Sequence, residues 1–277
     1  MKLSDVSKTA IFTLRCRALE TQKARPLIHD PMAVYCQDQL AGLASPQEKA
    51  ILFERKLSPR LTHHIALRAR KYDALIDDWI SRNQSSTVVN LGCGFDTRYW
   101  RIQHQKCRYL ELDLPEIIAL KKAALKGKLD YELIGCSVLD PAWIDQVTAI
   151  GNRDILLVAE GLFMYLPKPE VIGLFKTFSE RLHHSQIIFE VVSEAYTRGF
   201  WKKIVEAKLK RELGLDAGSS YDFGLRRARD VESFGQGLQV VGEWSYVDDP
   251  DVRPKIFKYL GLARTQWTVI ASINESR

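Results

Sequence analysis

The sequence has little that would indicate a secreted, membrane-spanning or zinc-binding protein. Its five cysteines are odd in number and none of them stand in a Cys-x-x-Cys spacing, so we expect no disulfide framework and no structural zinc site. The longest apolar stretches, such as 155–159 and 269–273, are far too short to cross a bilayer. The first residues lack the apolar core of a secretion signal, so we expect a cytoplasmic protein without a membrane partner.

The basic residues are not gathered in one place, although the chain carries a net charge of +6. Their densest groups alternate with acidic or apolar positions, which is typical of solvated helix faces, so a nucleic-acid partner is not expected. The adjacent histidines at 63–64 and 183–184 have no third ligand at suitable spacing, so no metal site is expected. Residues of the AVILMFWYC set make up 46% of the 277, as in ordinary globular proteins, and the chain is long enough to bury a full core.

The most informative stretch is a short β-branched run at 87–91 that ends in Gly92–Cys93–Gly94. Asp113 follows 21 residues after Gly92, at the end of the next expected strand, where a carboxylate can accept hydrogen bonds from ribose hydroxyls. The third small residue of the dinucleotide fingerprint is missing, because Thr97 occupies its place. This pattern favours a cofactor with a ribose but no pyrophosphate, and S-adenosylmethionine is the best candidate; an NAD-dependent oxidoreductase is the rival.

Strands and helices are expected to alternate from residue 87 onward, which is typical of an α/β protein with a doubly wound sheet. Strands are expected at 87–91, 107–112, 131–136, 154–159 and 186–191, with helices at 97–103, 115–126, 141–150 and 169–181. A helix at 200–212 and a loop at 214–224 precede two further strands at 238–246 and 266–273. The sheet should therefore be mostly parallel with a terminal antiparallel strand, as in class I (Rossmann-like) methyltransferases.

The first 60 residues are predicted to form helices, at 5–22 and at 31–39 after Asp30 as an N-cap. A long amphipathic helix follows at 61–82. We therefore expect a helical N-terminal lid over residues 1–60 and a cofactor-binding domain over residues 61–277.

Three motifs in this order, at 90–98, 111–115 and 159–166, resemble those of the leucine carboxyl methyltransferase family. The N-terminal Lys8–Thr9–Ala10 and His29–Asp30–Pro31 look more like its bacterial branch, the polyketide-type (tetracenomycin) O-methyltransferases. The resemblance covers nearly the whole chain. It implies a class I methyltransferase that uses S-adenosylmethionine.

The resemblance also implies roles for particular residues. Asp113 matches the ribose-binding acid, Arg68 the arginine that holds the cofactor's carboxylate with help from Lys8, and Glu160 the acid beside the cofactor's amino group. The full set of expected cofactor-binding residues is Lys8, Arg68, Gly92, Gly94, Asp96, Asp113, Leu114, Ser137, Val138, Glu160 and Gly161.

One position departs from the family pattern, because Ser137 stands where an aspartate often bonds the adenine amino group. A hydroxyl can still accept this hydrogen bond but without charge assistance, so cofactor affinity should be lower. Asp140 is a possible substitute from the next turn.

The expected reaction is O-methylation of a carboxylate or hydroxyl on a small molecule. No residue stands out as a general base, which favours an acceptor that is already ionised. Tyr165, Tyr196 and Tyr221 are candidate acceptor-binding residues. The alternatives are methylation of a protein's C-terminal leucine and a homologue that binds the cofactor without catalysis. A nucleic-acid methyltransferase is disfavoured, because 160–163 reads Glu-Gly-Leu-Phe rather than an Asn/Asp-Pro-Pro-aromatic motif.

Overall fold

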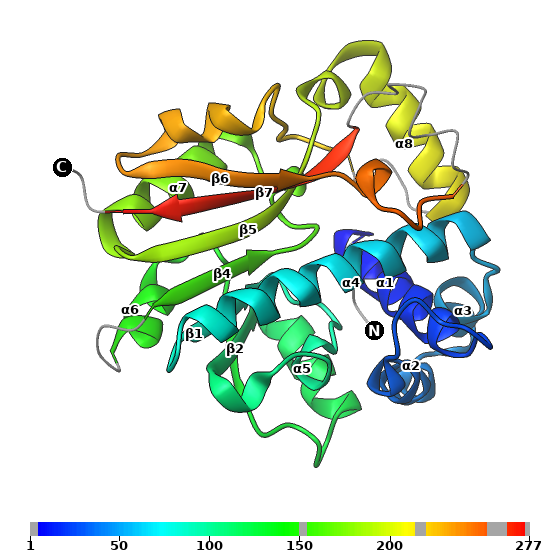
Figure 1. Cartoon of the computed structure of the whole chain (residues 1–277). Coiled ribbons are helices and arrows are strands. Elements are labelled where there is room, and N and C mark those ends of the chain that lie inside the picture. The colour runs from blue at the N-terminus through cyan, green and yellow to red at the C-terminus, as the bar shows by residue number, and fades with distance from the viewer. Residues whose placement is uncertain (1–4, 150–153, 214–219, 254–264, 275–277) are drawn as a thin grey trace.

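The computed structural model describes residues 5–149, 154–213, 220–253 and 265–274 (Figure 1). Of the expected loop at 214–224, residues 214–219 lie outside these ranges. No helix within the described ranges is both long and apolar enough to span a membrane.

A seven-stranded sheet forms the centre of the molecule, with the order β3-β2-β1-β4-β5-β7-β6. The first five strands are parallel, and β7 runs antiparallel between β5 and β6. The strands are β1 (Thr87–Leu91), β2 (Arg108–Asp113), β3 (Glu132–Gly135), β4 (Ile155–Ala159), β5 (Ser185–Val192), β6 (Leu238–Trp244) and β7 (Gln266–Ile273). The predicted α/β class and the antiparallel closing strand are confirmed, and each strand lies within two residues of its expected bounds.

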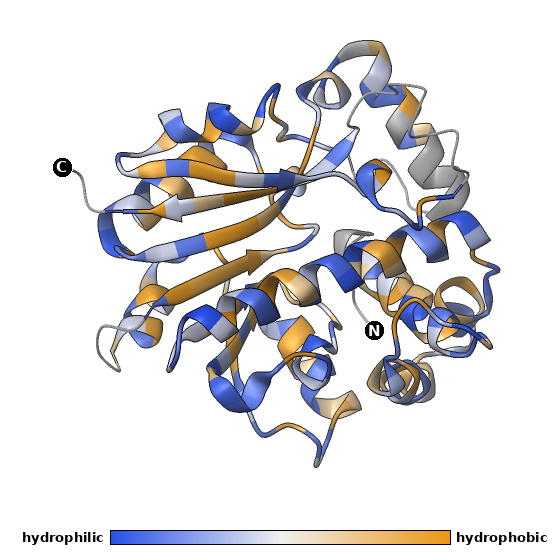
Figure 2. Ribbon diagram, viewed as in Figure 1, coloured by the Kyte–Doolittle hydropathy of each residue, from blue (hydrophilic) through white to orange (hydrophobic). Residues whose placement is uncertain are grey.

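Helices cover both faces of the sheet because alternate side chains of each parallel strand point to opposite faces. Val89, Leu157 and Ile187 share one row and pack with α6 (Ala142–Thr148) and α7 (Lys168–Arg181). The neighbouring row packs with the second half of α4 (Pro59–Arg82). β4 is buried along its whole length and is hydrophobic throughout in Figure 2.

The remaining helices are α1 (Asp5–Thr21), α2 (Pro31–Leu43), α3 (Pro46–Lys49), α5 (Pro115–Ala124) and α8 (Gly199–Leu213). In Figure 1, α1–α3 and α8 lie beyond the carboxyl ends of the parallel strands. α1 and α2 share an apolar cluster with the first half of α4 and with α5, through residues such as Leu14, Leu40, Ile65 and Ile117. The N-terminal helices therefore pack on the same edge of the sheet where the glycine turn was predicted.

The helix predicted at 97–103 is wrong, since this segment contains only a 3-10 turn at Arg98–Trp100. The backbone amides of Trp100, Arg101 and Ile102 bond to carbonyls within the turn, but those at its two ends bond to side chains. The N–H of Arg98 donates to Asp96 Oδ1 at 3.1 Å, and the N–H of Gln103 donates to Asp77 Oδ1 at 2.8 Å. These side-chain bonds compete with a continuation of the helix at both ends of the segment.

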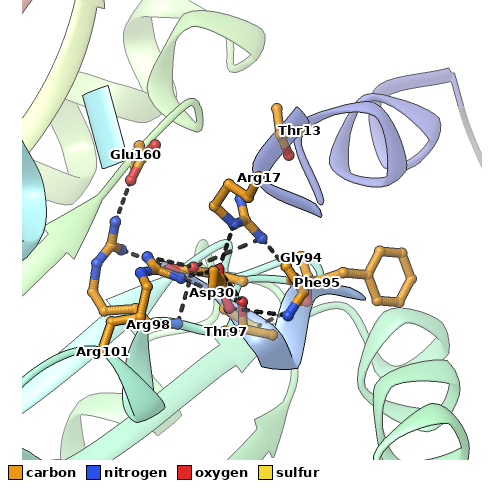
Figure 3. A network of polar contacts seen from close by, with 12 residues as sticks. Thr13, Arg17, Asp30, Gly94, Phe95, Thr97, Arg98, Arg101 and Glu160 are labelled. Atoms are coloured by element: carbon orange, nitrogen blue, oxygen red, sulfur yellow. Dashed lines mark hydrogen bonds and ion pairs between the residues drawn. The ribbon is translucent and has the colours of Figure 1, made fainter. Parts of the chain in front are cut away.

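Asp30 joins the N-terminal helices to the segment after the glycine turn. Its Oδ1 accepts from the Ala33 N–H at 2.9 Å, so the predicted N-cap is confirmed. Its Oδ2 also accepts from Arg17 at 3.2 Å, from the Thr97 hydroxyl at 2.7 Å and from Arg101 (Figure 3). Asp30 is completely buried, so these donors are its only solvation within the described part of the chain.

Gly94 brings α1 into direct contact with the turn after β1. Its φ of +50° is strained for any residue with a side chain. A Cβ placed on Gly94 would lie 2.7 Å from the Cβ of Ala10 in α1, far inside van der Waals contact. Gly127 also has a positive φ, +75°, but nothing lies within 4 Å of its Cβ position.

We expect Asp30→Ala to lower the free energy of unfolding by about 3–5 kcal/mol, because it leaves Arg17 and Arg101 buried without this carboxylate. Ser58→Ala removes only a helix cap, at the start of α4, and should cost about 1 kcal/mol. Urea unfolding of both variants measures the difference. Equal losses would mean that Asp30 acts as a cap alone.

We expect Gly94→Ala to lower the free energy of unfolding by about 2–5 kcal/mol, because it adds both backbone strain and a clash with Ala10. Gly127→Ala adds only the strain and should lower it by about 1–2 kcal/mol. Combining Gly94→Ala with Ala10→Gly removes the clash, so the double variant should be more stable than the two single losses added together. Strict additivity in urea unfolding would contradict the close packing of α1 on the turn.

Candidate active site

One cavity of about 660 Å³ lies at the carboxyl ends of β1, β2 and β4 and extends between α1, the start of α4 and α8. Ligands of open α/β sheets bind at this edge. The predicted cofactor residues that line it are Arg68, Gly92, Gly94, Asp96, Asp113, Leu114, Ser137, Val138, Glu160 and Gly161, and the three predicted acceptor-site residues, Tyr165, Tyr196 and Tyr221, line it too. Lys8 does not; it is half-buried on α1, next to the lining residue Thr9.

The glycine turn is closely fitted to its surroundings. Gly92 has a φ of +61°, and a Cβ there would lie 2.8 Å from Cδ1 of Leu162. Asp113, at the end of β2, accepts the Gly94 N–H at 2.6 Å and the Leu114 N–H at 2.7 Å. Burial raises the pKa of the Asp113 carboxyl, and these two bonds only partly oppose that shift. The carboxylate is thus fixed at the cavity wall with lone pairs that remain for a ligand.

Side chains from two helices hold the carbonyls of the same turn. Arg17 of α1 donates to the Phe95 carbonyl at 2.9 Å, and Lys121 of α5 donates to the Asp96 carbonyl at 2.6 Å. Lys121 is completely buried and pairs with the equally buried Glu111 of β2 at 2.5 Å. The turn is therefore held from several sides before any ligand binds.

A chain of buried ion pairs runs beside the turn and reaches the cavity (Figure 3). Arg98 bonds Asp73 at 2.8 Å, Asp96 at 2.7 Å and Glu160, while Arg101 bonds Asp73 at 2.7 Å. Burial alone would raise the pKa of Asp96, but the neighbouring arginines hold it well below its usual range. Glu160, directly after β4, is also an acid with a lowered pKa, since Arg68 and Arg98 outweigh its burial.

Arg68 of α4 lies between two carboxylates. Its Nε donates to Glu160 at 2.6 Å, and its Nη1 donates to both oxygens of Glu190 at 3.0 and 2.8 Å. Nη2 makes no hydrogen bond to the described residues and would lie 3.9 Å from a Cβ on Gly161, which lines the cavity. Burial alone would lower the pKa of Arg68, yet Glu190 and Glu160 raise it, so the group stays charged.

Sequence reasoning missed several polar residues of this region. Arg17 and Gln266 line the cavity, and Glu190 lies behind it in β5. Glu190 stands within the otherwise apolar run at 187–192, and an acid in such a run is the one signal that could have indicated a buried partner. His63 and His64 also line the cavity. Sequence reasoning considered them only as metal ligands and did not place them in the site.

The part of the cavity away from the glycine turn is aromatic. The rings of Tyr165 and Tyr221 are 5.7 Å apart, those of Tyr196 and Trp201 are 6.0 Å apart, and His64 packs edge-on against Tyr246 at 4.4 Å. Burial raises the pKa of Tyr165 to about 12, and the charge of Glu190 adds to this shift. Tyr165 is therefore protonated at neutral pH and cannot act as a base without a further partner.

Comparison with known proteins shows similar chains among methyltransferases. The tetracenomycin polyketide synthesis O-methyltransferase TcmP of Streptomyces glaucescens is 27% identical over 265 residues, covering 94% of this chain and 91% of the relative. The S-adenosyl-L-methionine-dependent methyltransferase dpfgK of Gibberella zeae is 24% identical over 200 residues, covering 70% and 67%.

Two solved structures share the fold. A DUF574 family protein from Streptomyces avermitilis superposes with a TM-score of 0.52 at 14% identity, over 94% of this chain and 96% of its own. The PH0226 protein from Pyrococcus horikoshii has a TM-score of 0.50 at 10% identity, over 76% and 92%.

The family profile described as leucine carboxyl methyltransferase matches residues 10–179, which include the glycine turn, Asp113 and Glu160. The chain therefore belongs to the leucine carboxyl methyltransferase family and is an S-adenosylmethionine-dependent methyltransferase with the class I fold.

Proposed function

We propose that this enzyme transfers a methyl group to a carboxylate or hydroxyl oxygen of a small, flat, aromatic molecule. The observation that carries the proposal is a single cavity with two chemically different halves. One half contains the glycine turn, Asp113 and Glu160, and the other is lined by Tyr165, Tyr196, Tyr221 and other rings. The name of TcmP, which refers to polyketide synthesis and O-methylation, agrees with such an acceptor.

The cofactor would lie along the sheet edge, from β2 and β3 to β4. Asp113 would accept from the ribose hydroxyls, since its lone pairs are only partly used by the backbone. Leu114 and Val138 would cover the adenine, and Ser137 would accept from its amino group. Asp140 is a poor substitute for Ser137, because it does not line the cavity and its Oδ1 accepts the Ala142 N–H at 3.0 Å.

At the methionine end, Glu160 would accept from the cofactor's ammonium group. Arg68 would donate to its carboxylate through Nη2, the nitrogen that neither Glu160 nor Glu190 occupies. Gly92, Gly94 and Gly161 would allow the close approach of the ligand to the backbone, and Asp96 would hold the shape of the turn. Lys8 stays a proposal that depends on movement of α1, since it does not line the cavity.

The bound cofactor supplies an electrophilic methyl group on a positively charged sulfur. The chain's own contribution is alignment, which can account for about 7–11 kcal/mol of the barrier. A carboxylate acceptor is already ionised and needs no general base. A phenol of low pKa is largely ionised at neutral pH, so it has little need of one. The high pKa of Tyr165 agrees with such an acceptor, because this tyrosine is no base at neutral pH.

Residues 1–60 would act as a lid over the cofactor-binding domain at 61–277. Five of these residues line the cavity, which supports the proposal: Thr9, Ala10, Thr13, Arg17 and Ser58.

We also propose a cytoplasmic location, consistent with an intracellular cofactor.

Calorimetric titration of the purified protein tests the cofactor site. We expect micromolar binding of S-adenosylmethionine and S-adenosylhomocysteine and no binding of NAD. Transfer of a labelled methyl group to aromatic acids and phenols, compared with a peptide ending in leucine, then tests the acceptor. Transfer to the peptide alone would favour the protein-carboxyl alternative, and binding with no transfer to any acceptor would favour a non-catalytic homologue.

Asp113→Ala should weaken S-adenosylmethionine binding by about 1.5–3 kcal/mol, because hydrogen bonds to a charged acceptor are lost. Ser137→Asp should strengthen binding by about 1 kcal/mol, since it restores charge assistance at the adenine. Asp140→Ala, a nearby carboxylate outside the cavity, serves as the control and should leave the affinity unchanged. If Asp113→Ala bound as tightly as the wild type, the ribose site would have to lie elsewhere.

A further inference from the structure

Glu190 is a buried acid directly behind the cavity wall. It lies near the carboxyl end of β5, is 2% exposed and does not itself line the cavity. Its Oε2 would lie 3.6 Å from a Cβ on Gly161, which does line it. Gly161 therefore lies between the carboxylate and the part of the cavity proposed to hold the methionine end of the cofactor.

All three hydrogen bonds that the structure gives the Glu190 carboxylate are donated to it. Arg68 Nη1 donates to both carboxylate oxygens, and the Gln266 side-chain amide donates to Oε1 at 2.6 Å. A carboxylate accepts such bonds better than a carboxylic acid does, so they favour the ionised form. Burial works in the other direction and raises the pKa of Glu190. A further positive charge nearby would therefore stabilise this group.

The ion-pair chain that contains Glu190 has more acids than bases among its described members. Contacts of 4 Å or less join four guanidinium groups to five carboxylates. The members are Arg17, Arg68, Arg98 and Arg101, with Asp30, Asp73, Asp96, Glu160 and Glu190. Lys121 and Glu111 form a separate neutral ion pair, from which Lys121 also donates to the Asp96 carbonyl.

The unbalanced negative charge lies at the cavity end of this chain. Asp30, Asp73 and Asp96 pair with Arg17, Arg98 and Arg101, and Arg98 also reaches Glu160. Among the described residues Glu190 has Arg68 as its one guanidinium partner, and it shares that arginine with Glu160. Glu190 lies against Gly161 from the protein side, Glu160 lines the cavity itself, and their side chains are only 3% and 11% exposed. In such a place a charge acts over several ångströms with little screening.

We infer that Glu190 makes this site select a cofactor with a net positive charge, so that S-adenosylmethionine is bound in preference to S-adenosylhomocysteine. The sulfonium ion of the former makes its net charge +1, and the thioether of the latter leaves it neutral. Glu190 is a positioning residue in this account, because Arg68 and Gly161 separate it from the ligand. Loss of the sulfonium charge on methyl transfer would then favour release of the product.

The test is a set of dissociation constants from calorimetry for S-adenosylmethionine, S-adenosylhomocysteine and sinefungin, whose added amine restores the positive charge. The wild type should bind S-adenosylmethionine and sinefungin at least as tightly as S-adenosylhomocysteine. Glu190→Gln should lower the affinity ratio of the charged ligands to the neutral one about tenfold. Glu132→Gln is the control, since this exposed carboxylate at the start of β3 lies outside the cavity and should leave the ratio unchanged.

Equal weakening of all three ligands in Glu190→Gln would overturn the inference, because it would mean that Glu190 only holds Arg68 in place. Tighter binding of S-adenosylhomocysteine than of S-adenosylmethionine by the wild type would overturn it too, whether or not the variant folds. These results differ from a failure of the cofactor assignment, in which the wild type would bind none of the three ligands.

Discussion

The ion pairs around Asp96 are the interaction on which the arrangement of this molecule depends. Asp96 follows the glycine turn, and its carboxylate bonds Arg98 and Arg101 while Arg17 of α1 lies 3.9 Å away. The same two neighbouring arginines reach Asp73 in α4 and Asp30 before α2. The turn, the N-terminal helices and the long helix are thereby fixed to one another through one buried charge cluster.

Such a cluster stabilises a protein only when every charge has well-formed partners, since the cost of removing ions from water is large. The part of it around Asp30 and Asp73 meets that condition, with each arginine bonded to two or more carboxylates or carbonyls. The part at the cavity does not, because Arg68 serves two carboxylates and keeps one nitrogen directed at Gly161. The same network therefore holds the turn and helices rigidly at one end. At the other end it leaves an excess of negative charge next to the cavity, where a cationic ligand would be stabilised.

Much of the fold could be predicted from the sequence, because short apolar strands alternate with amphipathic helices. β1 has the predicted bounds, and the antiparallel position of β7 followed from the two closing strands. The segment 97–103 was predicted wrongly, because side-chain acceptors on Asp96 and Asp77 compete with helical hydrogen bonds. Asp30 was recognised only as a cap, since its ion pairs connect residues 13 to 71 positions apart, and no local pattern records them.

The candidate site followed from motifs whose residues lie at the ends of strands, and the sheet gathers such ends at one edge. Glu190 and Gln266 escaped notice because they lie on strands that carry no motif and meet only through the antiparallel insertion of β7. The individual roles of the lining residues stay predictions, because a shared cavity shows proximity and not contact with a ligand.

The most direct measurement is a crystal structure of the protein with S-adenosylhomocysteine. The account predicts a ligand along the sheet edge, with its ribose hydroxyls bonded to Asp113, its amino group at Glu160 and its carboxylate at Nη2 of Arg68. A ligand in the aromatic half of the cavity, or a ribose without contact to Asp113, would contradict it.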